Sequence, residues 1–262
     1  MDVCNASLPQ HLPDLVLDII FSNLKLSDLY SCMLVCRNWN RAINDGSSEP
    51  WKSICRRELT KEFLESDHLS PLKSHKDKIR ALCHSWNPDD CSKNIVVENR
   101  GFTFVRNLIA ESTDMVRTKI GYNTGKHTWE ITWIEPLGTV AMIGVSTKDA
   151  PLRCDGYEQL LGANKYSWGW NLVGNTLVHN AIPHGNYPLL KNIPKNQFGE
   201  NLRLVLDCEI GTLHFEKNNV FLGIAFENLP TTKLYPSVSV VYGKSKVKVL
   251  YIGNTESARR KT

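Results

Sequence analysis

The chain has 262 residues, of which 42% are hydrophobic and 22% charged, with a formal net charge of +4; this composition is typical of a globular protein with one large domain or two unequal ones. The basic residues are dispersed apart from a short run at 259–261, so the charge pattern argues against nucleic-acid binding. No stretch approaches the roughly 18 consecutive apolar residues of a membrane span, and the first residues lack the apolar core of a secretory signal.

The hydrophobic spacing up to about residue 90 predicts helices. Pro13 suits the first turn of a helix, because that position needs no backbone N–H. Ser27 is predicted to cap a second helix, and a third short helix is predicted around Trp39 and Ile43. The first helix has one broad apolar stripe, made of Val16, Leu17, Ile20, Phe21 and Leu24.

Two further helical segments are predicted before the pattern changes. Residues 44–50, NDGSSEP, have the composition of a loop, and Pro50 opens an apolar stripe that continues from Trp51 to Phe63. Residues 76–86, KDKIRALCHSW, form the last helical piece, which the loop residues NPDD close.

After Cys91 the period of the apolar residues falls to two, which is typical of strands with one buried face. In HTWEITW (127–133), Trp129, Ile131 and Trp133 are predicted to share a face. Further strands are predicted at NLRLVLD (201–207), TLHF (212–215), FLGIAF (221–226), VSVVY (238–242) and KVKVLYI (246–252). Many short strands separated by turn signals predict a β-sandwich.

The sequence therefore predicts an α+β fold with two parts. A small helical module occupies residues 7–56, and a helical connector at 57–90 packs on the second domain. That domain covers 64–254, with a β core at about 91–254. A helical module of this size has little core of its own and needs a partner or a neighbouring domain.

The search for catalytic and metal-ligating residues finds no convincing set. No phosphate-binding glycine motif, H-E-x-x-H or C-x-x-C pair occurs, so no cofactor and no metal site is predicted. Cys32 and Cys36 are four apart on a helix and are interpreted as core filling. Cys154 with His179 or His184 could form a nucleophile and base, but nothing in the spacing requires it. The eight cysteines are expected to be reduced.

Aromatic residues give the more informative signal. In YSWGWNL (166–172), Trp168 and Trp170 share a strand face and are interpreted as sandwich core, while Gly169 permits a close backbone approach. Tyr157 and Tyr242 each stand beside a glycine near a strand end or loop. Such tyrosines are suited to peptide binding, and a half-buried edge position is the other reading.

The helical module resembles an F-box, a three-helix motif that docks on a Skp-type adaptor of ubiquitin ligases. The resemblance rests on Leu12-Pro13, Ile20-Phe21, Leu24, the Leu29 region, Val35-Cys36 and Trp39. Leu15 stands where the motif usually has an acidic residue. The resemblance implies that the adaptor is bound by Leu12, Pro13, Leu17, Ile20, Phe21 and Leu24.

The β region resembles a SPRY (B30.2) domain. The matching blocks are HTWEITW, SWGWNL, GENLRLVLDCEIGTLHFEKNN (199–219) and LYPSVSVVYG (234–243). SPRY loops present a surface to a short peptide, and Leu108 and Glu111 stand where Pro and Gln are expected. The resemblance implies peptide binding by Arg106, Leu108, Ala110, Tyr157, Leu160, Tyr242 and Gly243.

The order F-box then SPRY, with almost nothing else, resembles a family of F-box/SPRY proteins. This resemblance implies a non-catalytic substrate-recognition subunit of an E3 ubiquitin ligase. The implied partners are a Skp-type adaptor, a target peptide and a large RING ligase of the PAM/Highwire kind, in the cytoplasm at synapses, where the complex restrains synapse growth. A scaffold that stabilises its SPRY partner is the alternative, and an enzyme is a third class.

Overall fold

The computed structural model describes residues 12–188 and 196–253. The predicted first residues of the helical module (7–11), the last predicted residue of the sandwich (254) and the basic run at 259–261 lie outside the described residues. The chain divides into two compact units, Met1–Arg80 and Ala81–Thr262. Residues 57–80 of the predicted connector thus belong to the first unit, and residues 81–90 belong to the second.

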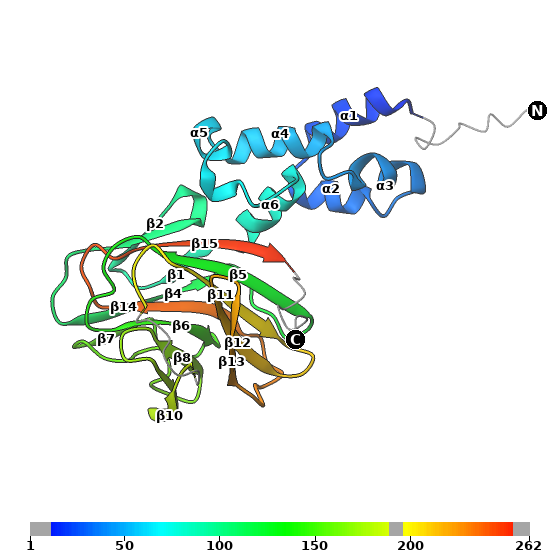
Figure 1. The fold of residues 1–262 in the computed structure, drawn as a ribbon. Coiled ribbons are helices and arrows are strands. Elements are labelled where there is room, and N and C mark those ends of the chain that lie inside the picture. The colour runs from blue at the N-terminus through cyan, green and yellow to red at the C-terminus, as the bar shows by residue number, and fades with distance from the viewer. Residues whose placement is uncertain (1–11, 189–195, 254–262) are drawn as a thin grey trace, which may run out of the picture. The chain divides into compact units, whose positions relative to one another are not determined.

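Short helices make up the first unit (Figure 1). Pro50 lies in the first turn of the fourth helix, as the sequence predicts, whereas Pro13, predicted for the first turn of the first helix, is its N-cap. The second helix begins at Leu26 with Lys25 at the N-cap, so the prediction of Ser27 as the cap is wrong. The helices are α1 (Asp14–Ser22), α2 (Leu26–Cys32), α3 (Arg37–Asn44), α4 (Glu49–Glu58), α5 (Lys61–Leu64) and α6 (His75–Cys83), with a 3-10 turn at Asp67–Leu69.

Helix α6 ends before the predicted loop NPDD, and that loop is in fact a strand. Strand β1 (Trp86–Cys91) pairs with β4 (Ser112–Thr118), so the β region begins five residues before the predicted Cys91. The register shifts within β1, between Trp86 and Cys91. An irregular strand at the edge of a sheet tolerates proline, which explains why Pro88 did not prevent pairing.

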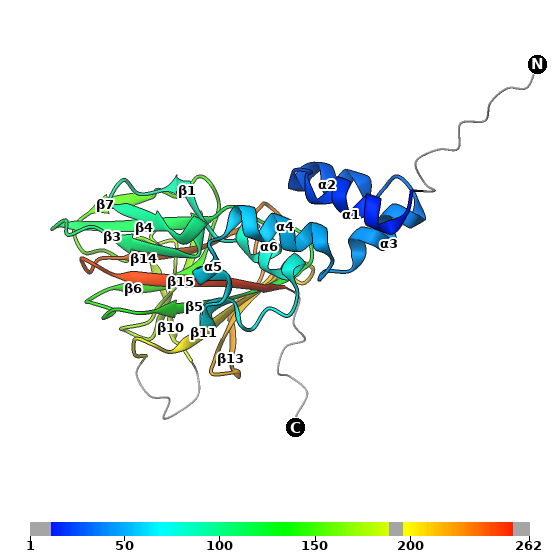
Figure 2. The same cartoon turned by 90° about the horizontal axis from the view of Figure 1, so that it is seen from above.

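The second unit is a sandwich of two antiparallel sheets (Figure 1; Figure 2). Among the described residues the first sheet has eight strands in the order β1-β4-β14-β6-β8-β9-β10, with β7 paired to β4. Its further strands are β6 (Ala141–Ser146), β7 (Arg153–Asp155), β8 (Ser167–Asn171), β9 (Thr176–His179), β10 (Ile182–Asn186) and β14 (Tyr235–Val240).

The second sheet has seven strands within residues 12–188 and 196–253, in the order β13-β12-β11-β5-β15-β3-β2. Strand β5 is central and pairs with both β11 and β15, and its apolar face, Trp129, Ile131 and Trp133, is buried. The strands are β2 (Ile95–Glu98), β3 (Thr103–Arg106), β5 (Lys126–Trp133), β11 (Asn201–Asp207), β12 (Thr212–Lys217), β13 (Val220–Phe226) and β15 (Lys246–Gly253).

The two tryptophans of YSWGWNL lie in the core, as predicted: Trp168 is 8% exposed and Trp170 is fully buried. Between them, Gly169 permits the expected close approach. A Cβ at this position would lie 2.2 Å from the carbonyl oxygen of Leu161. The loop that contains Leu161 is therefore seated directly on strand β8, and this fixes the loop that presents Tyr157.

Candidate functional site

An apolar groove opens where four loops of the sandwich converge. The loops connect β3 to β4, β5 to β6, β7 to β8, and β14 to β15. The groove has a volume of about 600 Å³. It is lined by Leu108, Ile109, Ala110, Gly138, Thr139, Tyr157, Val241, Tyr242 and Gly243. Five of the seven residues predicted for peptide binding line it, and Arg106 and Leu160 do not.

Arg106 is 1% exposed, so its side chain supports the groove from inside. Its Nε donates to Asp114 Oδ2 at 2.7 Å, and its Nη2 donates to the carbonyl oxygens of Ile109 and Ser112, each at 2.7 Å. Its Nη1 donates to the carbonyl oxygen of Asn107 at 3.1 Å. The expectation of direct peptide contact by Arg106 is therefore corrected: a buried guanidinium holds the shape of the loop at 107–111.

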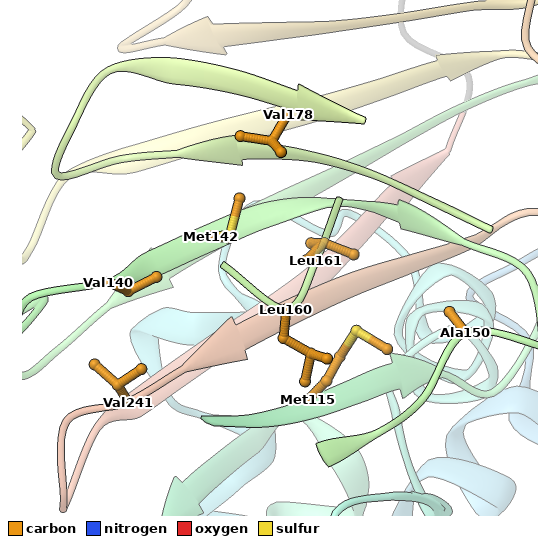
Figure 3. Close-up of a cluster of buried hydrophobic side chains, with 8 residues drawn as sticks. All are labelled: Met115, Val140, Met142, Ala150, Leu160, Leu161, Val178 and Val241. Atoms are coloured by element: carbon orange, nitrogen blue, oxygen red, sulfur yellow. The ribbon is translucent and has the colours of Figure 1, made fainter. Parts of the chain in front are cut away.

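Leu160 is 2% exposed and belongs to a buried cluster, so its expected contact with peptide is corrected too. Figure 3 shows its side chain directed towards Met115, in the same cluster as Val241. Val241 also lines the groove. Leu160 therefore packs beneath the groove and determines where the loop after β7 lies.

Tyr157 connects two walls of the groove while remaining half exposed. The backbone N–H of Glu111 donates to the Tyr157 hydroxyl at 3.1 Å, and the N–H of Gly156 donates to the carbonyl oxygen of Glu111 at 2.9 Å. The Thr113 hydroxyl donates to the carbonyl oxygen of Gly156 at 2.8 Å. These bonds join the loop after β3 to the loop after β7, so the tyrosine ring is presented on a braced backbone.

Two glycines allow the remaining walls to approach each other. A Cβ at Gly243 would lie 2.5 Å from Leu108 Cδ2, and a Cβ at Gly138 would lie 2.7 Å from Tyr242 Cβ. Gly138 also has φ +73, a conformation that side chains disfavour. Gly138, Thr139, Ile109 and Val241 were not predicted. The loop at 135–139 has no periodic pattern, and only the turn composition of its own residues PLGT (136–139) could have indicated it.

The helical unit has its own small core. Leu17 and Phe21 of α1 are fully buried, and the Phe21 ring meets the Trp39 ring edge-on at 5.3 Å. The Trp51 indole N–H donates to the carbonyl oxygen of Ile43 at 2.7 Å. Leu17 and Phe21 were expected to bind the adaptor. Because their side chains are buried, this expectation is corrected to a role in positioning α1 against α3 and α4.

Comparison with known proteins agrees with both resemblances. An F-box-like family model matches residues 9–57, and a SPRY domain model matches residues 126–253. F-box/SPRY domain-containing protein 1 of Drosophila mojavensis is 53% identical over 238 residues, which cover 91% of this chain and 94% of the relative. This chain belongs to the F-box/SPRY family. The same-named protein of Drosophila virilis matches with the same identity and coverage.

Solved structures show the same fold for the SPRY unit. The SPRY domain of human HERC1 is 20% identical with a TM-score of 0.52, over 64% of this chain and 98% of that domain. The TRIM65 PSpry domain is 16% identical with a TM-score of 0.50, over 66% of this chain and 94% of that one. The F-box/SPRY chain thus has helices in its F-box region followed by the two-sheet SPRY sandwich.

The F-box unit exposes an apolar face that the sequence analysis assigned only in part. Of the predicted adaptor-binding residues, Pro13 and Ile20 are exposed, and Leu12 and Leu24 are half-buried. The larger exposed apolar side chains include several that were not predicted. They are Leu15 (72% exposed), Val16, Ile19 (59%), Leu34 (87%) and Val35 (62%). Residues 15, 16, 19 and 20 share one helix face. The residue spacing alone could therefore have predicted that this face is separate from the one that contains Leu17 and Phe21.

The Cys154 thiol is poorly suited to nucleophilic attack. Burial, and then the charges of nearby carboxylates, raise its pKa above the usual value, whereas a reactive cysteine has a lowered pKa. His179 instead stacks on Trp168, with ring centroids 4.6 Å apart, and bonds to the carbonyl oxygen of Ser167 at 2.8 Å. In the described part of the chain, no group of three potential metal ligands occurs and no helix is long and apolar enough to span a membrane.

Proposed function

We propose that this F-box/SPRY chain is the substrate-recognition subunit of an E3 ubiquitin ligase. The observation that supports the target-binding half is the apolar groove at the convergence of four SPRY loops. Its walls contain Leu108, Ala110, Tyr157, Tyr242 and Gly243, which the resemblance implied. The groove's volume of about 600 Å³ can accommodate side chains of a peptide, and exposed tyrosines provide much contact area at low entropic cost.

The F-box unit supplies the docking half of the proposal. Its exposed apolar side chains, including Leu15, Ile19 and Leu34, leave the module with a surface that is costly to keep in water. A Skp-type adaptor is the partner that we assign to this face. Ile20 and Pro13 then contact the adaptor directly, while Leu17 and Phe21 hold the helix in place.

The chain itself performs no bond chemistry in this proposal. Binding of the adaptor by one unit and of the target by the other raises the effective concentration of target lysines near the loaded conjugating enzyme. No cofactor or metal takes part. The raised pKa of the Cys154 thiol supports a non-catalytic role.

The finer assignment rests on the resemblance stated for the sequence. It names a large RING ligase of the PAM/Highwire kind as a further partner and places the complex in the cytoplasm of synapses, where it restrains synapse growth. The proposed domain bounds are 7–56 for the F-box, 57–90 for a helical connector, and 64–254 for the SPRY domain.

A pull-down from neuronal lysate tests the proposal with three baits: wild type, Ile20→Asp and Tyr242→Ala. Wild type should recover an adaptor and a RING ligase. Ile20→Asp should lose the adaptor alone, because it places a charge on the docking face. Tyr242→Ala should lose the target alone. If neither variant changes the recovered proteins, the two surfaces are wrongly assigned.

Target abundance separates the degradative role from the stabilising scaffold. Removal of the chain from neurons should raise the level of a target captured through the groove, and re-expression of wild type, but not of Ile20→Asp, should lower it again. A fall in target abundance on removal would instead establish the scaffold function.

A further inference from the structure

A second hollow adjoins the groove of the SPRY unit. It has a volume of about 370 Å³ and shares Gly138 with the first, so the loop at 135–139 forms a common wall. The second hollow is lined by Pro136, Leu137, Gly138, Leu172, Val173, Asn196, Gln197 and Phe198. Nothing in the sequence analysis assigned a role to these residues.

Exposed apolar side chains gather at this pair of hollows. Of the eleven large hydrophobic residues that are exposed among the described residues of the SPRY unit, six line one hollow or the other. They are Leu108, Ile109, Tyr157 and Tyr242 in the first hollow, and Val173 and Phe198 in the second. Contiguous exposed apolar surface of this kind marks an interaction site, and here it extends beyond the first groove.

The second hollow is held in shape by its own hydrogen bonds. The Asn196 side-chain amide donates to the carbonyl oxygen of Leu172 at 3.0 Å and to Asn175 Oδ1 at 2.9 Å. On the other side of Phe198, the backbone N–H of the next residue, Gly199, donates to the carbonyl oxygen of Trp133 at 2.6 Å. Phe198, whose side chain is 60% exposed, therefore lies on a segment that hydrogen bonds hold on both sides.

The charges around the hollows favour a particular ligand. Neither hollow is lined by Asp, Glu, Lys, Arg or His, so each suits an uncharged side chain. At the Tyr157 end of the first hollow, Glu111 and Glu158 are both exposed, and no ion pair joins either to another residue that the structure describes. Asp155, close by, is already paired with Arg153 at 2.6 Å. Two carboxylates outside any described ion pair therefore remain at this end, while the exposed Lys244 follows Gly243, on the loop between β14 and β15.

We propose that the SPRY unit recognises one extended target peptide that places an apolar side chain in each hollow and a basic residue beside Glu111 and Glu158. The inference rests on the proposed function and specifies its ligand. The shared wall at Gly138 makes the two hollows successive subsites along one chain. The two carboxylates set the order of the peptide residues, because the basic residue lies beside the first hollow, which Tyr157 lines, and not beside the second, which Phe198 lines.

Selection of random dodecapeptides on the full-length chain, followed by affinity measurement, tests the inference. Phe198→Ser should weaken binding of the selected peptides by about tenfold or more, which is the effect expected for an apolar anchor. Alanine in place of the apolar peptide residue that occupies the second hollow should weaken binding to wild type by a similar factor. The same peptide change should not weaken binding to Phe198→Ser any further. Ile210→Ser is the matched control, because Ile210 is 63% exposed and lies outside both hollows.

The outcomes separate this inference from the function on which it rests. Peptides whose binding depends on Tyr242 but not on Phe198 would overturn the second subsite and leave the groove as the target site. Absence of any selected peptide, or binding that is independent of Tyr242, would overturn the groove itself. Conversion of a dimer to a monomer by Phe198→Ser, measured by sedimentation, would show that a second copy covers the hollow and would also overturn the inference.

A separate variant tests whether the peptide needs a basic residue beside Glu111 and Glu158. Glu158→Lys should weaken binding of the selected peptides, and the loss should shrink as salt is added, because charges at an interface rim act through screened interactions. Glu227→Lys makes the same change in net charge at another exposed position. Equal affinities for the two variants, or selected peptides without a basic residue, would refute the charged subsite.

Discussion

Replacement of Arg106 by methionine tests whether the groove depends on its buried support. The variant keeps much of the side chain's apolar length and removes the guanidinium. Asp114, which is fully buried, then loses the donor at 2.7 Å and keeps only the uncharged donors Ser92, Asn94 and Ser112. Leaving one partner of a buried ion pair uncompensated costs about 3–5 kcal/mol, and that estimate sets the expected loss.

Urea unfolding of the full chain, followed by tryptophan fluorescence, measures the loss. With a slope of about 2 kcal/mol per M of urea, a loss of about 4 kcal/mol lowers the unfolding midpoint by about 2 M. Arg203→Met is the control, because Arg203 also pairs with carboxylates, Glu130 at 2.7 Å and the buried Glu216 at 3.7 Å, but the arginine side chain is 27% exposed. Since water reaches this arginine and replaces part of both interactions, the expected cost is lower than for Arg106→Met.

The double variant Arg106→Met/Asp114→Asn separates charge from shape. It should be more stable than Arg106→Met alone, because an amide has no unpaired charge to bury. Peptide binding should stay weak in both, since the carbonyl oxygens of Ile109 and Ser112 have lost their donor and the loop at 107–111 is no longer held. Equal losses for Arg106→Met and Arg203→Met, or full binding by the double variant, would refute the reasoning.

Three further predictions concern the two surfaces and the cysteine. Tyr242→Ala should weaken target binding by more than about 1 kcal/mol in a titration, and unchanged affinity would reduce this tyrosine to a packing role. Ile19→Asp should abolish adaptor capture and leave the circular dichroism unchanged. Phe21→Asp should unfold the F-box unit, because it buries a charge. Equal behaviour of the two variants would contradict the assigned faces. Cys154→Ser should bind target normally, and the wild-type thiol should react with iodoacetamide at pH 7 more slowly than free cysteine, because its raised pKa leaves less thiolate.

The sequence predicts the strands better than the sites. Alternation in HTWEITW identified Trp129, Ile131 and Trp133 as one face because β5 is central, with neighbours on both sides, and burial there follows the period of two. Strand β1 escaped prediction for the opposite reason. It is an edge strand with an irregular register, and local composition, including Pro88, favours a loop.

The helical stripe shows how spacing alone can merge two faces. Adjacent helix positions lie about 100° apart, so a stripe that includes both Ile20 and Phe21 must cross from solvent to core. The structure divides it there: Phe21 is fully buried and Ile20 is 42% exposed. The exposed residues Leu34 and Val35 follow the end of α2, where no helical period applies, and only their apolar character could have indicated them.

The groove illustrates a limit that lies in chain topology. Its walls come from residues near 108, 138, 157 and 242, and no sequence spacing predicts that these loops meet. The adjacent glycines singled out Tyr157 and Tyr242 separately, and resemblance to SPRY domains supplied Leu108 and joined the three in one site. The resemblance did not distinguish residues that touch a ligand from residues that hold the loops. That distinction depends on burial, and a buried arginine such as Arg106 is predicted only when its partner is known.

The buried residues Arg106 and Leu160 contribute to the groove because each holds one of its loops in place. Arg106 bonds to three backbone carbonyls of the loop that ends at Ser112, and Leu160 anchors the opposite loop in the core. A substitution of either therefore changes the distance between walls without touching a ligand. Affinity should fall together with stability for these two positions, and should fall alone for Tyr242, so a plot of one against the other across the variants separates residues that build the groove from residues that bind in it.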